Sequence, residues 1–378
     1  MTDAPVEDTL DSAYTRLHAT GPEYDGYLSN HGPMVVEAMA QRGLGDHTHE
    51  WLDGYTRRLD DRPGPGRAVT DEEWREALGD RRRVADWTAR FSREIAEEGW
   101  HPVLLRWWPR LLPGIAAGAT HGVIRTGHAV RALSGQETAA RRTELAQALG
   151  YWAARWLPVP GATPFSSESA DGSVPGPHQP DDRNTAPVST HLAPDATAAL
   201  TAVPPVPDRS QGLLHRVSQL PGLSTWPATL ASLREPATVA EAEGHLSRLV
   251  EAATRYYLHH GHGNSVMLVH AATAPNAVLR TLPALPAEMR LPSFRAAWSA
   301  TAAVVAAYRP DHSAPPTETE ALLSQAVSAE EVFQRAVDHG DEHVVKLADT
   351  ALDVHRRSGD SAALAAALRA TQLIPADG

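Results

Sequence analysis

Residues 83–98, RVADWTARFSREIAEE, carry large apolar side chains at spacings of three and four residues (Val84, Trp87, Phe91 and Ile95). This spacing places them on one face of an α-helix and leaves charged side chains on the other. Similar periodicity predicts helices over 33–42, 239–259, 265–280, 293–308, 330–337, 342–356 and 362–373. Strand signals are sparse, and no repeat of 34 or 40 residues is evident. The sequence therefore predicts an all-α fold.

The middle of the chain changes character abruptly after Leu157. Before it, the apolar stretches 102–133 and 137–157 predict buried helices, with Pro109 and Pro113 kinking or splitting the first. Residues 158–207 are rich in Pro, Ser, Thr, Asp and Gly, which predicts a long loop or disordered insertion. We expect residues 1–378 to form a single large helical domain, interrupted by this insertion.

Composition excludes several classes of site and partner. Cysteine is absent, so a metal would have to be held by His, Asp, Glu or a group derived from lysine. The net charge of −12 opposes non-specific binding to nucleic acid. No apolar run reaches the ~18 to 20 residues of a membrane span, and the N-terminus lacks the pattern of a signal peptide. We expect a soluble, cytoplasmic protein that binds neither nucleic acid nor membranes.

Lysine is almost missing from the chain. Of 34 basic side chains only Lys346 is a lysine, and it lies near the start of a predicted helix. Arginine cannot replace lysine where the amine must lose its proton, because a guanidinium stays charged whereas a buried ammonium shifts its pKa readily. On composition alone, survival by chance on a solvated helix face is the more frequent explanation.

Five of the 19 histidines lie among small or apolar residues, where a buried imidazole needs a partner. They are His31, His121, His128, His270 and His343. His121 and His128 are seven residues apart and share a helix face, and His343 and Lys346 are neighbours three residues apart. A hydrogen-bonded core histidine is the commoner explanation for each one taken alone. Histidines and lysine could nevertheless share a metal, since a deprotonated lysine reacts with carbon dioxide to give a carbamate whose oxygens bind metal as a carboxylate does.

Four segments resemble the motifs of the questin oxidase-like family. They are Leu28-Ser29-Asn30-His31-Gly32-Pro33-Met34, residues 119–133 (ATHGVIRTGHAVRAL), Val269-His270-Ala271-Ala272-Thr273-Ala274-Pro275 and Gly340-Asp341-Glu342-His343-Val344-Val345-Lys346-Leu347. The resemblance runs from about Tyr24 to Leu352, the insertion excepted. Fungal members open anthraquinone rings in aromatic polyketide biosynthesis. The resemblance implies a helical fold and a non-haem iron bound by His31, His121, His270, His343 and carboxylated Lys346.

The chain departs from the family pattern in one place. In the family pattern, a second histidine follows four residues after the one that matches His121. This sequence has Arg125 at that position and His128 three residues further on. We treat His128 and Arg125 as candidate catalytic residues, with His128 either a ligand or a neighbour of the ligands. Four imidazoles and one carbamate oxygen would leave one position of an octahedron, which suits iron(II). The expected reaction is oxidation or cleavage of a small phenolic or quinone substrate with molecular oxygen.

Three alternatives remain open on sequence alone. The first is a Baeyer-Villiger-type monooxygenase of the same family, which would take electrons from NADPH, directly or through a partner. The second is a metal-free helical ligand-binding or scaffold protein. The third is a zinc peptidase using His339, Glu342 and His343, which fit the pattern H-x-x-E-H. That pattern needs a continuous helix, whereas Gly340 and Asp341 resemble a helix stop and an N-cap.

Overall fold

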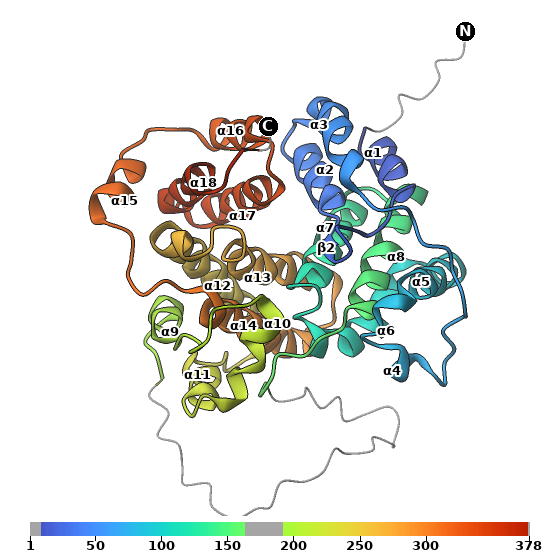
Figure 1. Cartoon of the computed structure of the whole chain (residues 1–378), viewed down its shortest axis with the longest axis horizontal. Coiled ribbons are helices and arrows are strands. Elements are labelled where there is room, and N and C mark those ends of the chain that lie inside the picture. The colour runs from blue at the N-terminus through green and yellow to red at the C-terminus, as the bar shows by residue number, and fades with distance from the viewer. Residues whose placement is uncertain (1–8, 163–191, 377–378) are drawn as a thin grey trace, which may run out of the picture.

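A computed structural model describes residues 9–162 and 192–376, and helices form nearly all of its regular structure (Figure 1). This confirms the all-α prediction. The N-terminal half contains α1 (Thr9–His18), α2 (Gly32–Gln41), α3 (Thr48–Tyr55), α4 (Trp74–Ala77), α5 (Val84–Glu98), α6 (Trp100–Leu111), α7 (His121–Gly135) and α8 (Ala139–Ala154). The C-terminal half contains α9 (Ala196–Ala202), α10 (Leu213–Ser218), α11 (Trp226–Ser232), α12 (Val239–His260), α13 (Val269–Thr281), α14 (Arg290–Tyr308), α15 (Pro316–Leu323), α16 (Ala329–His339), α17 (Glu342–Ser358) and α18 (Ser361–Leu373).

Short elements connect these helices. Single turns of 3₁₀ helix occur at Gly45–His47, Thr56–Arg58, Arg81–Arg83, Leu112–Gly114, Leu220–Gly222, Gly261–Gly263, Leu282–Ala284 and Ala287–Met289. Strands β1 (Glu23–Tyr24) and β2 (Leu28–Ser29) pair antiparallel, with Tyr24 opposite Leu28. The chain passes directly from β2 to His31, so this hairpin fixes where α2 begins. None of the helices in the described residues is long and apolar enough to cross a membrane.

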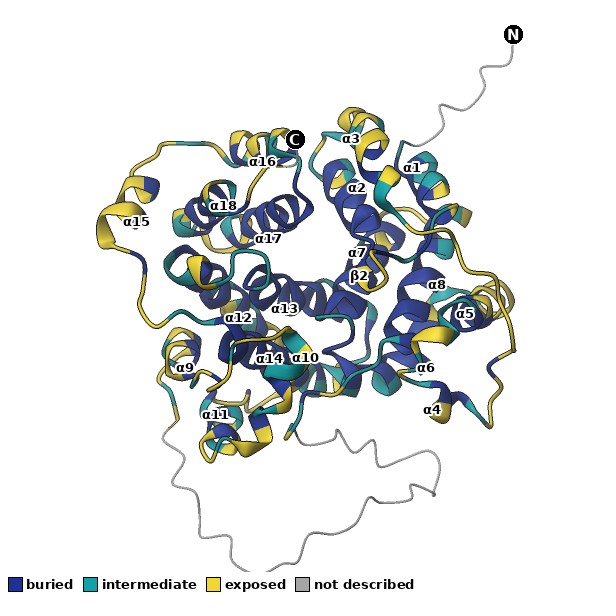
Figure 2. Ribbon diagram, in the orientation of Figure 1, coloured by how far each residue is buried: buried dark blue, intermediate teal, exposed yellow. Residues whose placement is uncertain are grey.

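Buried segments occur in both halves of the molecule (Figure 2). One large cluster of buried apolar side chains contains residues from both halves. Its N-terminal part forms as the spacing in residues 83–98 predicts: Trp87 and Phe91 point inwards from α5 and meet the ring of Trp107, with centroids 5.4 and 5.0 Å away. Edge-on contacts between buried aromatic rings add to the free energy of burying them. The two halves of the chain therefore share a core.

The stretch 102–133 divides as its prolines predict, although not at both of them. Pro109 lies inside α6, and the break follows at Pro113 in the 3₁₀ turn Leu112–Gly114. Gly118, Ala119 and Thr120 then take positive φ angles of 53°, 57° and 70°, after which α7 begins at His121. A left-handed conformation at a β-branched threonine is unusual and is held in place by its surroundings.

The predicted loop over 158–207 is only partly correct. Residues 163–191 lie outside the described part of the chain. Residues Ala196–Ala202 are helical, and the Asp195 carboxylate caps this helix by accepting a hydrogen bond from the Ala198 amide at 2.8 Å. Leu200 and Val203 are completely buried. The sequence prediction missed this short apolar helix because the composition of the whole stretch 158–207 is dominated by its polar residues.

Four helices from distant parts of the sequence, α2, α7, α13 and α17, pack against one another at the centre of the molecule. Helices α7 and α13 approach especially closely at Gly127. A Cβ atom there would lie 2.7 Å from both the Cβ and the carbonyl oxygen of Ala277. The close packing of this pair therefore requires glycine at position 127.

We predict that Gly127→Ala destabilises the protein by about 1–3 kcal/mol, because the new methyl group forces α7 away from α13. Gly135→Ala is the matched control. It lies in the same helix with nothing within 4 Å of the new atom, and it should be neutral or stabilising by up to ~1 kcal/mol. Chemical denaturation measures both changes. Equal stability of the two variants would contradict the close-packing argument.

Candidate metal centre

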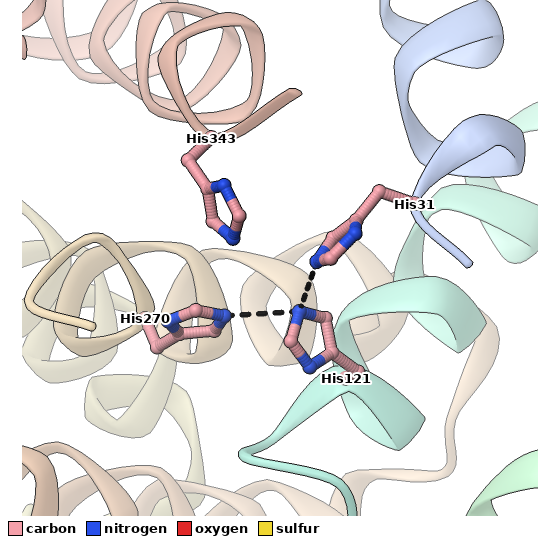
Figure 3. A group of neighbouring side chains, drawn as sticks. All are labelled: His31, His121, His270 and His343. Carbon is pink, nitrogen blue, oxygen red and sulfur yellow. Dashed lines mark hydrogen bonds between the residues drawn. The ribbon is translucent and has the colours of Figure 1, made fainter. Parts of the chain in front are cut away.

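Four buried histidine rings meet where α2, α7, α13 and α17 begin (Figure 3). The Nε2 atom of His121 lies 2.7 Å from Nε2 of His31 and 3.0 Å from Nε2 of His270. The His343 ring lies 4.7 Å from the His31 ring, centroid to centroid. All four side chains offer nitrogen atoms within 4.8 Å of one another. The four histidines that the resemblance implied as ligands thus come together in space.

Each of the four histidines lies at the N-terminus of a helix, which fixes the position of its backbone. His31 is the N-cap residue of α2, His121 is the first residue of α7, and His270 and His343 are the second residues of α13 and α17. The turn before His121 packs closely against the side chain of Tyr151. A Cβ atom on Gly118 would lie 2.6 Å from the Tyr151 hydroxyl, which contacts Ser29 Oγ at 2.5 Å, two residues before His31. Tyr151 therefore links the segments that carry two of the rings.

Hydrogen bonding leaves two of these rings with unprotonated Nε2 atoms facing each other. His121 Nδ1 faces the Gly118 carbonyl oxygen, and His270 Nδ1 faces the Met267 carbonyl oxygen at 3.1 Å. A neutral imidazole has one N–H, and a carbonyl can only accept, so in both rings the proton belongs on Nδ1. Two lone pairs 3.0 Å apart, with no proton between them, repel each other unless a cation binds both. This donor set therefore fits a metal ion.

A carboxylate stands behind the third ring. Glu342 Oε1 lies 3.3 Å from His31 Nδ1, although the angle is not that of a hydrogen bond. Arg58 donates to the other carboxylate oxygen at 2.6 Å, and the Tyr24 hydroxyl donates to Oε1 at 3.3 Å. Metal-binding histidines commonly have a carboxylate or carbonyl at their second nitrogen, which orients the ring. Glu342 is placed to do this for His31.

All four histidines are held neutral. Burial lowers the pKa of His31, His121 and His270 well below the ordinary value, and a charge on Lys346 would lower it further. Burial also lowers the pKa of His343 to about 3. Neutral rings have free lone pairs at physiological pH, which a metal requires.

Lys346 lies beside this cluster. Its Nζ is 3.4 Å from His121 Nε2, and its side chain is 1% exposed. The explanation that the lysine survived by chance on a solvated face is therefore wrong. Burial lowers the pKa of Lys346 to about 7, against a smaller opposite effect of Glu342 and Asp341. A substantial fraction of the amine is thus unprotonated at neutral pH.

His128 and Arg125 lie on α7 but make their contacts elsewhere. His128 Nδ1 is 2.6 Å from Glu37 Oε2, whereas Arg125 donates to both oxygens of Glu144 at 2.5 and 2.8 Å. Neither belongs to the group of four convergent histidines. His128, Glu37 and Asp349 form a second group close enough to share an ion, but arginines already bind the carboxylate oxygens, which disfavours a cation. A role for His128 or Arg125 in the reaction stays a prediction.

The zinc peptidase interpretation fails on helix continuity. Helix α16 ends at His339, Gly340 takes a left-handed φ of 88°, and the Asp341 side chain caps the new helix α17. His339 Nε2 contacts the carbonyl oxygen of Ile374 at 3.0 Å. His339 and His343 therefore lie on different helices and do not form the one-turn pair that the motif needs.

Little in the sequence indicates the residues that lie behind the candidate ligands. Glu342 resembled an ordinary acidic residue in the first turn of a helix, and Tyr24 and Arg58 carried no motif. The contacts that Glu342 makes with Tyr24, Arg58 and His31 join segments about 300 residues apart, which no local pattern reveals. Glu342 follows an N-cap and directly precedes a candidate ligand, and its place within the motif was the one available signal.

We predict that metal-free, carbonate-free protein becomes more stable as the pH rises from about 7 towards 10. In this window the unfolded chain keeps a proton on Lys346 that the folded chain has released, so the free energy of unfolding rises by up to about 1.4 kcal/mol per pH unit. Lys346→Met should remove this increment. Denaturant melts of both proteins at several pH values measure it, and parallel curves would contradict the buried, neutral lysine.

The match to known proteins agrees with this geometry. A family model described as Questin oxidase-like matches residues 29–351, a span that includes all four histidines and Lys346. A search of curated proteins found no match. Because the matched span covers most of the 378 residues, the chain belongs to the questin oxidase-like family.

Proposed function

We propose that this protein is a non-haem iron oxygenase that uses molecular oxygen to oxidise or cleave the ring of an aromatic polyketide. The convergence of three Nε2 atoms on one point, two of them with their protons held on Nδ1 by carbonyls, is the observation that carries the proposal. Family membership implies an oxidoreductase and suggests an aromatic polyketide as substrate. A phenolic or quinone ring of the anthraquinone kind is the substrate we favour.

The metal would be held by His31, His121, His270 and His343, together with carboxylated Lys346. Nitrogen and oxygen donors without sulfur suit iron(II), which when bound would supply electrons for oxygen activation. The protein's own contribution is to keep the rings neutral and oriented. Burial excludes water from them, and Glu342 places a negative charge behind His31.

Lys346 meets the requirements of carboxylation. Its unprotonated amine can attack carbon dioxide, forming an N–C bond and releasing a proton, and the product is a carbamate with one negative charge. The pKa of about 7 provides the free amine, and the buried position slows hydrolysis by limiting water. An anionic ligand here would offset the positive ends of the four helices that begin around the rings.

The direct test is metal analysis of protein purified without a polyhistidine tag. We predict about one iron per chain, lost in Lys346→Ala and partly restored by a small carboxylic acid such as propionate, which can occupy the space of the missing carbamate. Lys346→Arg keeps a long basic side chain, but its guanidinium stays protonated and cannot form a carbamate, so this variant should stay iron-poor. Native protein without a first-row metal would contradict the proposal and favour a metal-free binding protein.

We predict that Glu342→Gln weakens iron binding about 10- to 100-fold, because the carboxylate that orients and polarises His31 is lost. Glu330→Gln, an exposed change near the start of α16, is the matched control and should leave affinity unchanged. Competition with a chelator measures both affinities. Unchanged binding in Glu342→Gln would show that Glu342 does not support the ligand.

Oxygen uptake with a hydroxyanthraquinone distinguishes the two oxygenase classes. A dioxygenase consumes oxygen without a reductant, whereas the Baeyer-Villiger alternative requires NADPH or a partner that delivers its electrons. Labelled oxygen then reports whether one or both atoms enter the product. Lys346→Ala should abolish uptake in either case.

A further inference from the structure

A pocket rich in arginine opens at the far ends of the same four helices. Five guanidinium groups line it, and we call it the arginine pocket (Arg42, Arg131, Arg280, Arg356 and Arg357). They come from the end of α2 and from α7, α13 and α17, while the start of α12 forms the opposite wall. Its volume is about 500 Å³, enough for a small molecule.

Three of these arginines, Arg42, Arg131 and Arg280, are already paired with buried carboxylates, and we call them the floor arginines. Asp349 accepts hydrogen bonds from Arg42 at 2.8 Å, Arg131 at 2.9 Å and Arg280 at 2.7 Å. Asp353 accepts from Arg42 at 2.7 Å and from Arg280 at 2.8 Å. Arg131 also donates to Glu37 at 2.7 Å. These contacts neutralise the three floor arginines with three buried carboxylates.

The two arginines at the rim are not neutralised in the same way. In the part of the chain that the structure describes, Arg356 pairs with Asp353 alone, at 3.4 Å, and that carboxylate is already bound by two other arginines. Arg357 forms no ion pair within the described residues and contacts the side-chain oxygen of Asn276 at 3.3 Å. Positive charge is therefore crowded at the rim.

The charge count leaves an excess of positive charge. The five guanidiniums have three buried carboxylates for partners, Glu37, Asp349 and Asp353, of which Asp353 alone lines the pocket. The other acidic lining residue is Glu243, which is exposed and pairs with none of the five arginines among the described residues. Counting Glu243, one positive charge remains, in a chain whose net charge is −12. An anion would satisfy it.

We propose that the arginine pocket binds the phosphate group of a small molecule. Guanidinium groups donate paired N–H bonds that match phosphate oxygens, and the exposed rim lets a ligand reach Arg356 and Arg357 without opening the core. A cation is disfavoured, because the floor carboxylates are occupied by guanidiniums. The proposal does not depend on iron or on the oxygenase reaction, since none of the five histidine or lysine residues at the metal centre lines this pocket.

Phosphate binding should stabilise the packing of the four helices that carry the metal centre. Asp349, which binds three of the pocket arginines, is one helical turn from Lys346, and Arg131 lies ten residues after His121 in α7. A ligand bound only by the folded state raises the melting temperature. The inference can therefore be tested with full-length protein, whether or not it contains iron.

The experiment is calorimetric titration of the full chain with inorganic phosphate and pyrophosphate, with parallel thermal melts in a phosphate-free buffer. Potassium chloride at equal ionic strength controls for screening. We expect saturable binding with a rise in melting temperature that chloride does not produce. The double variant Arg356→Gln/Arg357→Gln should weaken binding roughly tenfold or more. Arg93→Gln, which removes an exposed arginine on α5, should leave it unchanged.

Three results would overturn the inference. They are an equal effect of chloride, unchanged phosphate affinity in the double variant, and tighter binding of succinate than of phosphate, which would assign the pocket to a dicarboxylate. Both rim residues are exposed, so the double variant should melt as the wild type does without phosphate. Arg357→Lys keeps the charge but not the planar fork, and its affinity should lie between those of the wild type and the double variant.

Discussion

Repulsion between unprotonated imidazole nitrogens is the constraint on which this structure depends. The carbonyls of Gly118 and Met267 face Nδ1 of His121 and His270, so two Nε2 lone pairs face each other at 3.0 Å. Without a cation the rings would be expected to move apart, and burial prevents them from being protonated instead. The folded chain therefore has to hold this arrangement by other means.

Asp349 provides much of this restraint. Its carboxylate, completely buried on α17, binds arginines from α2, α7 and α13, so one side chain ties together all four helices that carry the histidines. Leaving such a buried charge without partners costs several kcal/mol. Separating the helices that carry the three arginines from α17 would therefore destabilise the fold. The same network explains His128, whose ring pairs with Glu37 beside Arg131 rather than with the other histidines. What resembled a ligand in the sequence lies within the charged network that joins the helices.

The sequence was informative where a signal is local and weak where it is not. The spacing of Trp87 and Phe91 predicts α5, and Gly340 with Asp341 predicts the break between α16 and α17, because these patterns act within one or two turns. The convergence of His31, His121, His270 and His343 came from resemblance to a family, since spacing cannot place residues from four distant helices at one point. The partners of Glu342 and Asp349 were not predicted. An acidic residue in a helix looks the same in the sequence whether it faces solvent or a buried arginine.

The electrostatics of the centre explain why position 346 should be lysine. Four helices begin around the rings, and the positive ends of their dipoles disfavour a cation there. The histidines are neutral and contribute no charge to offset it, and Glu342 is shared with Arg58, which cancels much of its effect. Under the proposed function, a divalent ion would therefore need an anionic ligand inside the cluster. An aspartate or glutamate at 346 would be too short to extend as far as a lysine carbamate, and an arginine would add a second positive charge. Lysine alone offers a long side chain that can become neutral and then, after carboxylation, negative.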